Sequence, residues 1–198
     1  MMTAEPPNRY GVPDERDLVK RAKERDASAW ASLYDSYYPV VFKYVLARLP
    51  SPEDTEDVAS QVFLEALRTI DGYASRGKPL LAWFNSIARN LIAQRLRQRV
   101  REKRDEGVID PGSASSGMSD EIIERLDLAK ALTAITPDQQ DVIVLRFFLV
   151  MSIKETSAIL GKSENAVAVM QVRAIAALRR HLSAGTLKRL ISAGEVSL

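Results

Sequence analysis

The apolar residues of this chain recur at steps of three and four, and this spacing constrains the fold more than any other feature. Such spacing places apolar side chains on one face of an α-helix. A half-buried strand would instead alternate apolar and polar residues, and no convincing run of that kind occurs. The sequence therefore predicts an all-α fold. The first long stripe consists of Trp30, Leu33, Tyr34, Tyr37, Tyr38, Val41, Phe42, Val45, Leu46 and Leu49.

Proline and capping residues divide the first half of the chain into helices. Pro39 interrupts the first stripe, and because proline removes a backbone donor, it predicts a kink or a new helix start there. Ser51 and Pro52 mark the start of a second long helix, with the hydroxyl as cap and proline at the first helical position. That helix ends at the Asp-Gly pair that opens the loop of residues 71–79, and a third long helix follows the loop.

Residues 105–119 are rich in glycine and serine and hold little apolar surface to bury, which is typical of a linker. A chain of 198 residues suits two small domains on either side of it. The predicted architecture is two small helical domains joined by a flexible linker. Its parts are an N-terminal segment with the start of the first helix (1–24), a first domain (25–104), the linker (105–120), a second domain (121–184) and a C-terminal tail (185–198).

The second domain contains a predicted helix-turn-helix. Thr136 caps one helix, Ser152 and Glu155 form a capping box at the next, Gly161 ends that short helix, and Ser163 caps a longer one. A short turn with glycine between two such helices is typical of proteins that place the second helix in the DNA major groove. A helical hairpin inside an ordinary bundle is the alternative. Exposed candidates for DNA contact are Lys162, Glu164, Asn165, Ala168, Val169 and Arg173, with Arg179, Arg180 and Lys188 adding positive charge.

Charge is unevenly distributed, although the net charge is only +2. Residues 89–104 contain seven basic side chains and one acid, a bias that favours a polyanionic partner such as nucleic acid. A solvated helix end is the alternative. Residues 51–71 contain six acids and one base. This helix would repel DNA, so its acids either face a basic protein surface or simply stabilise the helix N-terminus.

Aromatic and basic residues are interleaved in and beside the loop of residues 71–79. Single-stranded DNA is bound by such sets, because bases stack on rings while cations follow the phosphates. Asn90, in the helix that follows, lies where an amide could read the edge of a flipped base. Trp83 and Phe84 also belong to the apolar stripe of that helix, so at least one of them is expected in the core. The set consists of Tyr73, Arg76, Lys78, Trp83 and Phe84.

Several functional classes lack the residues that they need. The sequence contains no cysteine and one histidine, His181, which excludes disulfides, thiolate zinc sites and multi-histidine metal sites. The GxxxxGK[ST], HExxH and GxSxG patterns are absent. No run approaches the ~18 apolar residues of a membrane helix, and the N-terminus has no apolar signal core. We therefore expect no catalytic residues, metal, cofactor or membrane insertion, and a cytoplasmic location.

Four segments, in this order, resemble the extracytoplasmic-function (ECF) group of the sigma-70 family. Residues 30–49 resemble the first conserved segment of its N-terminal domain, and DTEDVASQVFLEAL (54–67) is similar to the segment that docks on the polymerase clamp helices. AWFNSIARNLIAQRLRQR (82–99) looks like the segment that melts and reads the −10 promoter element. Residues 135–182 look like the domain that reads the −35 element.

The resemblance implies a sigma factor that binds core RNA polymerase and directs promoter-specific initiation, with an anti-sigma factor as a further expected partner. The implied polymerase contacts are Asp54, Asp57, Val58, Gln61 and Phe63. The implied contacts with the −10 element are Tyr73, Arg76, Trp83, Arg89, Asn90, Arg95 and Arg97. The implied contacts with the −35 element are Lys162, Ser163, Asn165, Ala168, Val169 and Arg173.

The last long helix departs from the family pattern. Many relatives have a basic and then a small polar residue after its buried valine, whereas this chain has Ala168 and Val169. Direct hydrogen bonding to bases is therefore weaker, and specificity depends more on Arg173, Asn165 and DNA shape. Two alternatives stay open: a stand-alone regulator that uses only the helix-turn-helix, and an enzyme in which acids of the 51–71 helix bind Mg²⁺.

Overall fold

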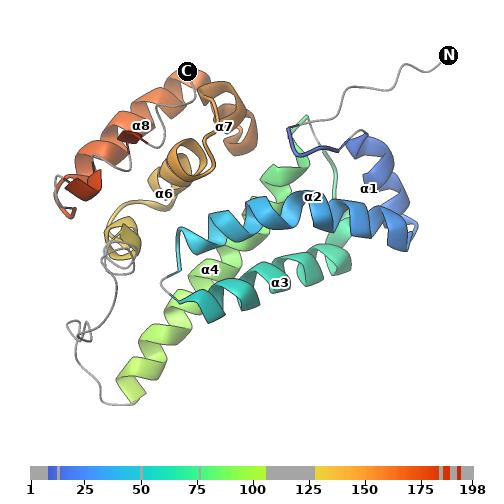
Figure 1. Cartoon of the computed structure of the whole chain (residues 1–198), viewed down its shortest axis with the longest axis horizontal. Coiled ribbons are helices and arrows are strands. Elements are labelled where there is room, and N and C mark those ends of the chain that lie inside the picture. The colour runs from blue at the N-terminus through green and yellow to red at the C-terminus, as the bar shows by residue number, and fades with distance from the viewer. Residues whose placement is uncertain are drawn as a thin grey trace.

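The computed structural model describes residues 9–12, 14–49, 51–75, 77–105, 128–182, 185–187 and 191–192. All regular secondary structure in these residues is helical, as predicted, and no strand occurs among them (Figure 1). The helices form an N-terminal unit that ends at residue 105 and a C-terminal unit that begins at residue 128. Apart from its first residue, the predicted linker lies outside the described residues.

Four long helices build the N-terminal unit: α1 (Glu15–Lys23), α2 (Ala27–Leu46), α3 (Pro52–Thr69) and α4 (Leu80–Asp105). The short 3-10 helix η1 (Ile70–Gly72) follows α3. Helices α2, α3 and α4 pack on one another, and α1 packs on α2. Their apolar stripes meet in one core, in which Tyr37, Tyr44 and Phe84 are the largest fully buried side chains.

Helix α2 continues through Pro39 as one helix. The sequence predicted a kink or a new helix start at this residue, and no new helix starts there. A proline inside a helix removes one backbone hydrogen bond and crowds the preceding turn. Tyr37 and Val41, on either side of Pro39, are fully buried in the same core. Tertiary packing therefore outweighs the free-energy cost of proline inside this helix. Packing, rather than local preference, also supplies most of the stability of helices in folded proteins.

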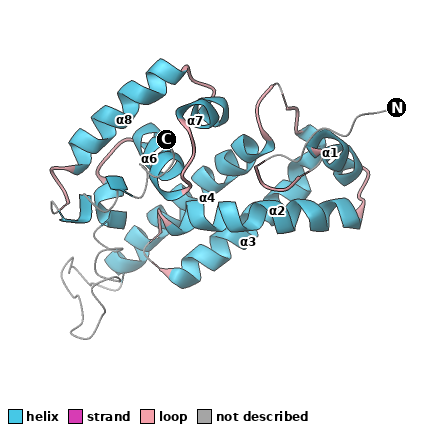
Figure 2. Ribbon diagram, turned by 45° about the horizontal axis from the view of Figure 1, so that its top comes forward, coloured by secondary structure: helices cyan, strands magenta, loops and turns pink. Residues whose placement is uncertain are grey.

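The C-terminal unit consists of helical residues 128–133 followed by α6 (Pro137–Ile143), the π-helix η2 (Val144–Phe148), α7 (Ile153–Leu160) and α8 (Glu164–Leu178). Helix α8 packs on both α6 and α7. Its buried side meets the other helices in a second apolar core, and Figure 2 shows the resulting bundle of short helices beside the longer N-terminal ones. Helices α7 and α8 are the predicted helix-turn-helix.

The helix ends lie where the capping residues predict them. Ser51 accepts a backbone hydrogen bond at the start of α3, and Ser163 does so at the start of α8. Thr136 and Ser152 both form complete capping boxes. Gly161 ends α7 with φ of 65°, a conformation that glycine adopts without steric cost.

The two units pack against each other. Element η2 lies against α2, and α7 lies against α4. Four side chains of the C-terminal unit are buried in the same apolar cluster as the N-terminal core: Val144, Leu145, Met151 and Ile159. The sequence did not predict this contact, because a linker leaves the relative placement of two domains open.

Candidate nucleic-acid interface

A pocket of about 570 Å³ lies where the loop of residues 71–79 and the first turns of α4 meet the C-terminal unit. Tyr73 and Trp83 line it, with ring centroids 4.8 Å apart and planes inclined by 42°. Trp83 is half-buried, whereas Phe84 is fully buried in the core. The expectation that at least one of these two neighbours is a core residue is therefore confirmed, and the other lines the pocket.

The loop that carries Tyr73 is anchored to α1 at two points. Lys23 Nζ donates a hydrogen bond to the carbonyl oxygen of Tyr73 at 2.6 Å, and the Leu80 backbone N–H donates to Glu15 Oε1 at 3.0 Å. Burial raises the pKa of the Tyr73 phenol above its ordinary value, and the charge of Glu15 adds to this effect. The ring is therefore neutral at physiological pH. Arg76, a predicted DNA contact, lies outside the described residues.

Two asparagines line the pocket, and only one of them was predicted. Asn90 is exposed at the pocket. Asn85 is only 7% exposed, yet neither its Oδ1 nor its Nδ2 has a hydrogen-bond partner. Because buried amides are normally paired, an unpaired one is a candidate for contact with a ligand. The sequence signal that could have identified Asn85 is a polar residue directly after Phe84 in an apolar stripe.

The predicted basic contacts of α4 have different surroundings. Arg95 Nη2 donates to Asp54 Oδ1 at 2.6 Å, and Arg99 Nε lies 2.5 Å from Asp54 Oδ2. Arg95 is thus engaged inside the N-terminal unit. Arg97 is exposed and accessible to a phosphate.

The residues predicted to bind polymerase fall into a buried and an exposed group. Asp57 and Gln61 are exposed on the outer face of α3. Leu64, which the sequence did not single out, is 50% exposed and lies one turn further along the same face. The buried group stabilises the N-terminal unit and consists of Asp54, Val58 and Phe63.

Helix α8 presents an exposed face on the side opposite to its core. The predicted contacts Asn165, Val169 and Arg173 lie on it at steps of four residues and are all exposed. Ala168 is half-buried at its edge. The Ser163 hydroxyl accepts a backbone N–H of the first turn at 3.2 Å, so this predicted DNA contact acts as the N-cap of α8.

Two branched aliphatic side chains occupy the middle of this face. Val169 is 48% exposed, and Val172, which was not predicted, is 67% exposed. Their spacing of three residues puts both on one side of the helix. The exposed face of α8 therefore combines two apolar side chains with the charge of Arg173.

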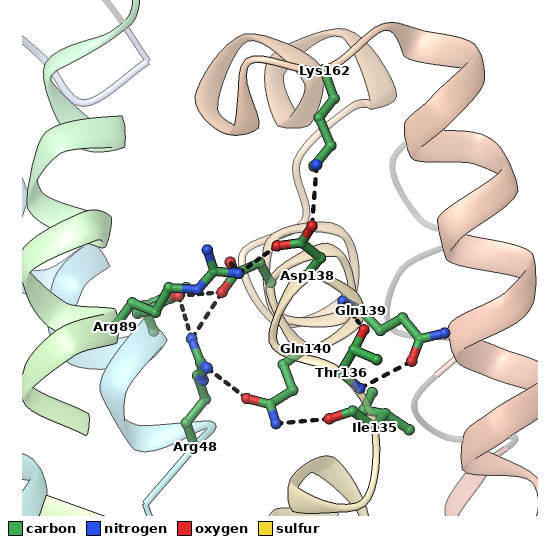
Figure 3. Close-up of polar contacts among 10 residues, drawn as sticks. Arg48, Arg89, Ile135, Thr136, Asp138, Gln139, Gln140 and Lys162 are labelled. Carbon is green, nitrogen blue, oxygen red and sulfur yellow. Dashed lines mark hydrogen bonds and ion pairs between the residues drawn. The ribbon is translucent and has the colours of Figure 1, made fainter. Parts of the chain in front are cut away.

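Four charged side chains form a network between the two units (Figure 3). Arg48, just after α2, donates to Asp141 Oδ1 at 2.8 Å. Arg89 Nη2 lies 2.7 Å from Asp141 Oδ2 and 2.6 Å from Asp138 Oδ1. The Tyr44 hydroxyl also donates to Asp141. The network therefore connects α2 and α4 of the N-terminal unit with α6 of the C-terminal unit.

Burial and pairing affect the two acids of this network differently. The side chains of Arg48 and Asp141 are each 5% exposed, and burial raises the pKa of Asp141 against the lowering effect of Arg48. Hydrogen bonds from Arg89 and Lys162 lower the pKa of Asp138, with Lys162 Nζ 3.1 Å from its Oδ2. The sequence predicted Arg89 and Lys162 only as DNA contacts, because nothing local indicates which acids they meet.

Two structural features associated with other functions were not found in the described part of the chain. None of its groups of histidine, aspartate and glutamate side chains is arranged to hold a metal ion. None of its helices combines the length and the apolar character that crossing a membrane requires.

Comparison with known proteins gives the family. Residues 33–102 match Sigma-70 region 2, and residues 125–178 match Sigma-70, region 4. The chain is 35% identical over 171 residues to the ECF RNA polymerase sigma factor BldN of Streptomyces coelicolor, a match that covers 84% of this chain and 65% of BldN. It is 33% identical over 184 residues to the ECF RNA polymerase sigma factor ShbA of Streptomyces griseus, covering 82% of this chain and 92% of ShbA.

A solved structure has the same fold. The sigma factor RpoE of Bartonella quintana, in complex with the anti-sigma factor NepR, superposes with a TM-score of 0.54 at 23% identity, covering 78% of this chain and 96% of RpoE. The two helical units thus share the fold of that sigma factor. The chain belongs to the ECF group of RNA polymerase sigma factors.

Proposed function

We propose that this chain directs RNA polymerase to promoters by binding alone, through three separate surfaces and without a catalytic step. The outer face of α3 docks on polymerase, the pocket beside α4 takes up bases of the −10 element, and α8 reads the −35 element. The observation that carries the proposal is the aromatic pair Tyr73 and Trp83, which lines a pocket on a basic helix. A regulator that used only the helix-turn-helix would leave this pocket without a role.

In the −10 pocket, an unstacked base would stack on Trp83 and Tyr73 while Asn90 reads its edge. Asn85 supplies a second amide, whose donor and acceptor are both available. Arg97 would hold the phosphates. Arg89 would do so as well once it is released from Asp138 and Asp141. Arg95, engaged by Asp54, contributes by positioning α4 rather than by touching DNA.

In the −35 element, α8 would enter the major groove with Asn165, Val169 and Arg173 toward the bases. Val169 and Val172 favour steps that carry thymine methyl groups. Arg173 adds either a base or a phosphate contact. The apolar centre of this face predicts a weaker salt dependence of −35 binding than a lysine- or arginine-rich helix would show, because fewer counterions are released.

For polymerase, we propose a stripe on α3 made of Asp57, Gln61 and Leu64. An exposed acid beside an exposed apolar side chain suits a partner surface with a basic rim and an apolar centre. We also propose that an anti-sigma factor binds this chain, as NepR binds RpoE, and that the chain acts in the cytoplasm, where it meets polymerase.

The proposal is tested by run-off transcription with core RNA polymerase on a pool of promoter fragments. Transcripts from a defined subset, dependent on added protein, are expected. The subset should lose its transcripts when Trp83 is replaced by alanine, while a Val100→Ala control at the exposed end of α4 keeps them. Transcription that does not depend on the protein, together with no co-migration with core enzyme, would contradict the proposal.

A further inference from the structure

We infer that α6 of the C-terminal unit is an interaction surface for the −10 face of the same chain, and that its docking masks the −10 pocket in the free protein. We name the four residues of its ionic part, Arg48, Arg89, Asp138 and Asp141, the clasp. The masking of DNA rests on the function proposed for the pocket. The docking of the two units does not.

The clasp serves the contact between the units rather than the fold of either one. The polar contacts of Asp141 are with Tyr44, Arg48 and Arg89, all from the N-terminal unit. Helix α6 has its own cap in Thr136 and does not need this carboxylate to begin. A buried carboxylate on one unit and a buried guanidinium on the other require each other, because either charge alone would be costly to bury.

Apolar contacts continue the same interface over the pocket. Leu145, Ile159 and Leu160 of the C-terminal unit line the pocket together with Tyr73 and Trp83. Leu145 is fully buried and Ile159 nearly so, in one cluster with the N-terminal core. The space that a flipped base would enter is therefore bounded by side chains of η2 and α7.

The loop beside the pocket also touches the turn of the helix-turn-helix. The Lys78 side chain passes so close to Gly161 that a Cβ at residue 161 would lie 2.5 Å from Lys78 Nζ. Glycine allows both this approach and the positive φ of the turn. Near the N-terminus, Arg9 Nη1 lies 2.8 Å from Glu155 Oε2 and adds a surface connection to α7.

The docked arrangement of the two units, called closed from here on, affects the two predicted DNA surfaces unequally. Asp138 pairs with Arg89 of the N-terminal unit, so its carboxylate occupies a cation that would otherwise meet a −10 phosphate. Asn165, Val169 and Arg173 remain exposed on α8. The closed chain should therefore exclude the single-stranded −10 element while its −35 face stays accessible.

The closed arrangement leaves several buried polar groups unsatisfied, among them the amide of Asn85 and the Nε atoms of Arg48 and Arg89, which favours reversibility. Asn85 lines the pocket without a hydrogen-bond partner, and the apolar side chains that the C-terminal unit adds to the pocket, Leu145, Ile159 and Leu160, offer none. Opening would give the amide water or a base edge. Promoter DNA and polymerase thus select the open chain, and their apparent affinity is reduced by the fraction of chains that are closed.

Docking is tested first, by energy transfer within the full chain. Since the sequence contains no cysteine, cysteines at the exposed positions Arg68 and Arg180 accept a donor and an acceptor dye selectively. Asp141→Ala is expected to give a longer and broader distance distribution than the unaltered chain. Asp35→Ala, which removes an equal charge at an exposed site outside the contact, should leave the distribution unchanged. Helicity by circular dichroism verifies that each variant is folded.

Masking is tested with a fluorescent, random-sequence single-stranded 12-mer DNA. Asp141→Ala should bind it about tenfold or more tightly than the unaltered chain, and Asp35→Ala should not. If Asp141→Ala fails to fold, Asp138→Ala replaces it in both tests. The Asp138 side chain is 47% exposed, so its removal should not prevent folding. An unchanged distance distribution in a folded clasp variant overturns the docking. A longer distance with unchanged 12-mer affinity overturns the masking, and run-off transcription then shows whether the proposed function survives.

Discussion

Arg89 Nη2 of the N-terminal unit lies 2.6 Å from Asp138 Oδ1 of the C-terminal unit. A cation predicted to hold promoter phosphates is thus paired with an acid of the same chain. Arg89→Ala should loosen the closed form but also remove a DNA contact. It should therefore bind the single-stranded 12-mer more weakly than Asp138→Ala does, by ~1–2 kcal/mol of binding free energy. Titrations of both variants at two salt concentrations measure this gap. Equal affinities would mean that Arg89 does not touch DNA.

Asn85 is expected to lower the stability of the free chain. Replacing it by leucine removes a buried unpaired amide at similar volume, so the free energy of unfolding should rise by ~1–3 kcal/mol in urea denaturation. The same variant should lose preference at one −10 position in transcription assays. Asn90→Leu, at an exposed position, is the matched control for stability and should change it by less than ~0.5 kcal/mol. A destabilised Asn85→Leu protein would mean that the amide is satisfied.

Val169 and Val172 should read thymine methyl groups. Replacing a contacted thymine by uracil in a −35 duplex removes one methyl group and should weaken binding by ~0.8 kcal/mol. The Val169→Ser variant should be insensitive to this exchange at the position that Val169 contacts. Duplexes with uracil at each −35 thymine in turn locate that position. If no single exchange weakens binding of the unaltered chain, α8 does not use these side chains for recognition.

Asp57 is expected to contact polymerase directly. Asp57→Arg reverses an exposed charge in the α3 stripe and should weaken binding to core enzyme by ~1–3 kcal/mol without lowering helicity. Asp35→Arg makes the same change on α2 and serves as the control. Affinity is measured by titrating labelled protein with core enzyme. Should both variants bind as tightly as the unaltered chain, the stripe is not the docking surface.

Local features determined how well the helices could be predicted. The caps Ser51, Thr136, Ser152 and Ser163 and the stop at Gly161 act within one helical turn, so the sequence alone contains the information, and all five are confirmed. A kink or a new helix start at Pro39 was predicted by equally local reasoning, and no new helix starts there. Burial of its neighbours is a long-range effect that no local rule includes.

Predictions for the candidate surfaces likewise succeeded where they depended on local sequence and failed where they depended on distant residues. Spacing on α8 correctly placed Asn165, Val169 and Arg173 on the exposed face, because helical periodicity fixes which side chains share a face. Ala168, also predicted to be exposed, is half-buried. Spacing on α3 did not reveal that Asp54 is buried, since that depends on Arg95 and Arg99, about forty residues away in the sequence. Asn85 was overlooked because its lack of partners is a property of the surrounding helices.

The sequence by itself determined the helical content, the helix ends, the helix-turn-helix and the family of this sigma factor, because these depend on periodicity and on contacts within a few residues. Only the tertiary structure decided which acids meet Arg48, Arg89 and Lys162. Asp138 and Asp141 approach Arg48 and Arg89 from the other side of a linker. Such pairs depend on how two separately formed units pack, and local sequence does not encode that placement.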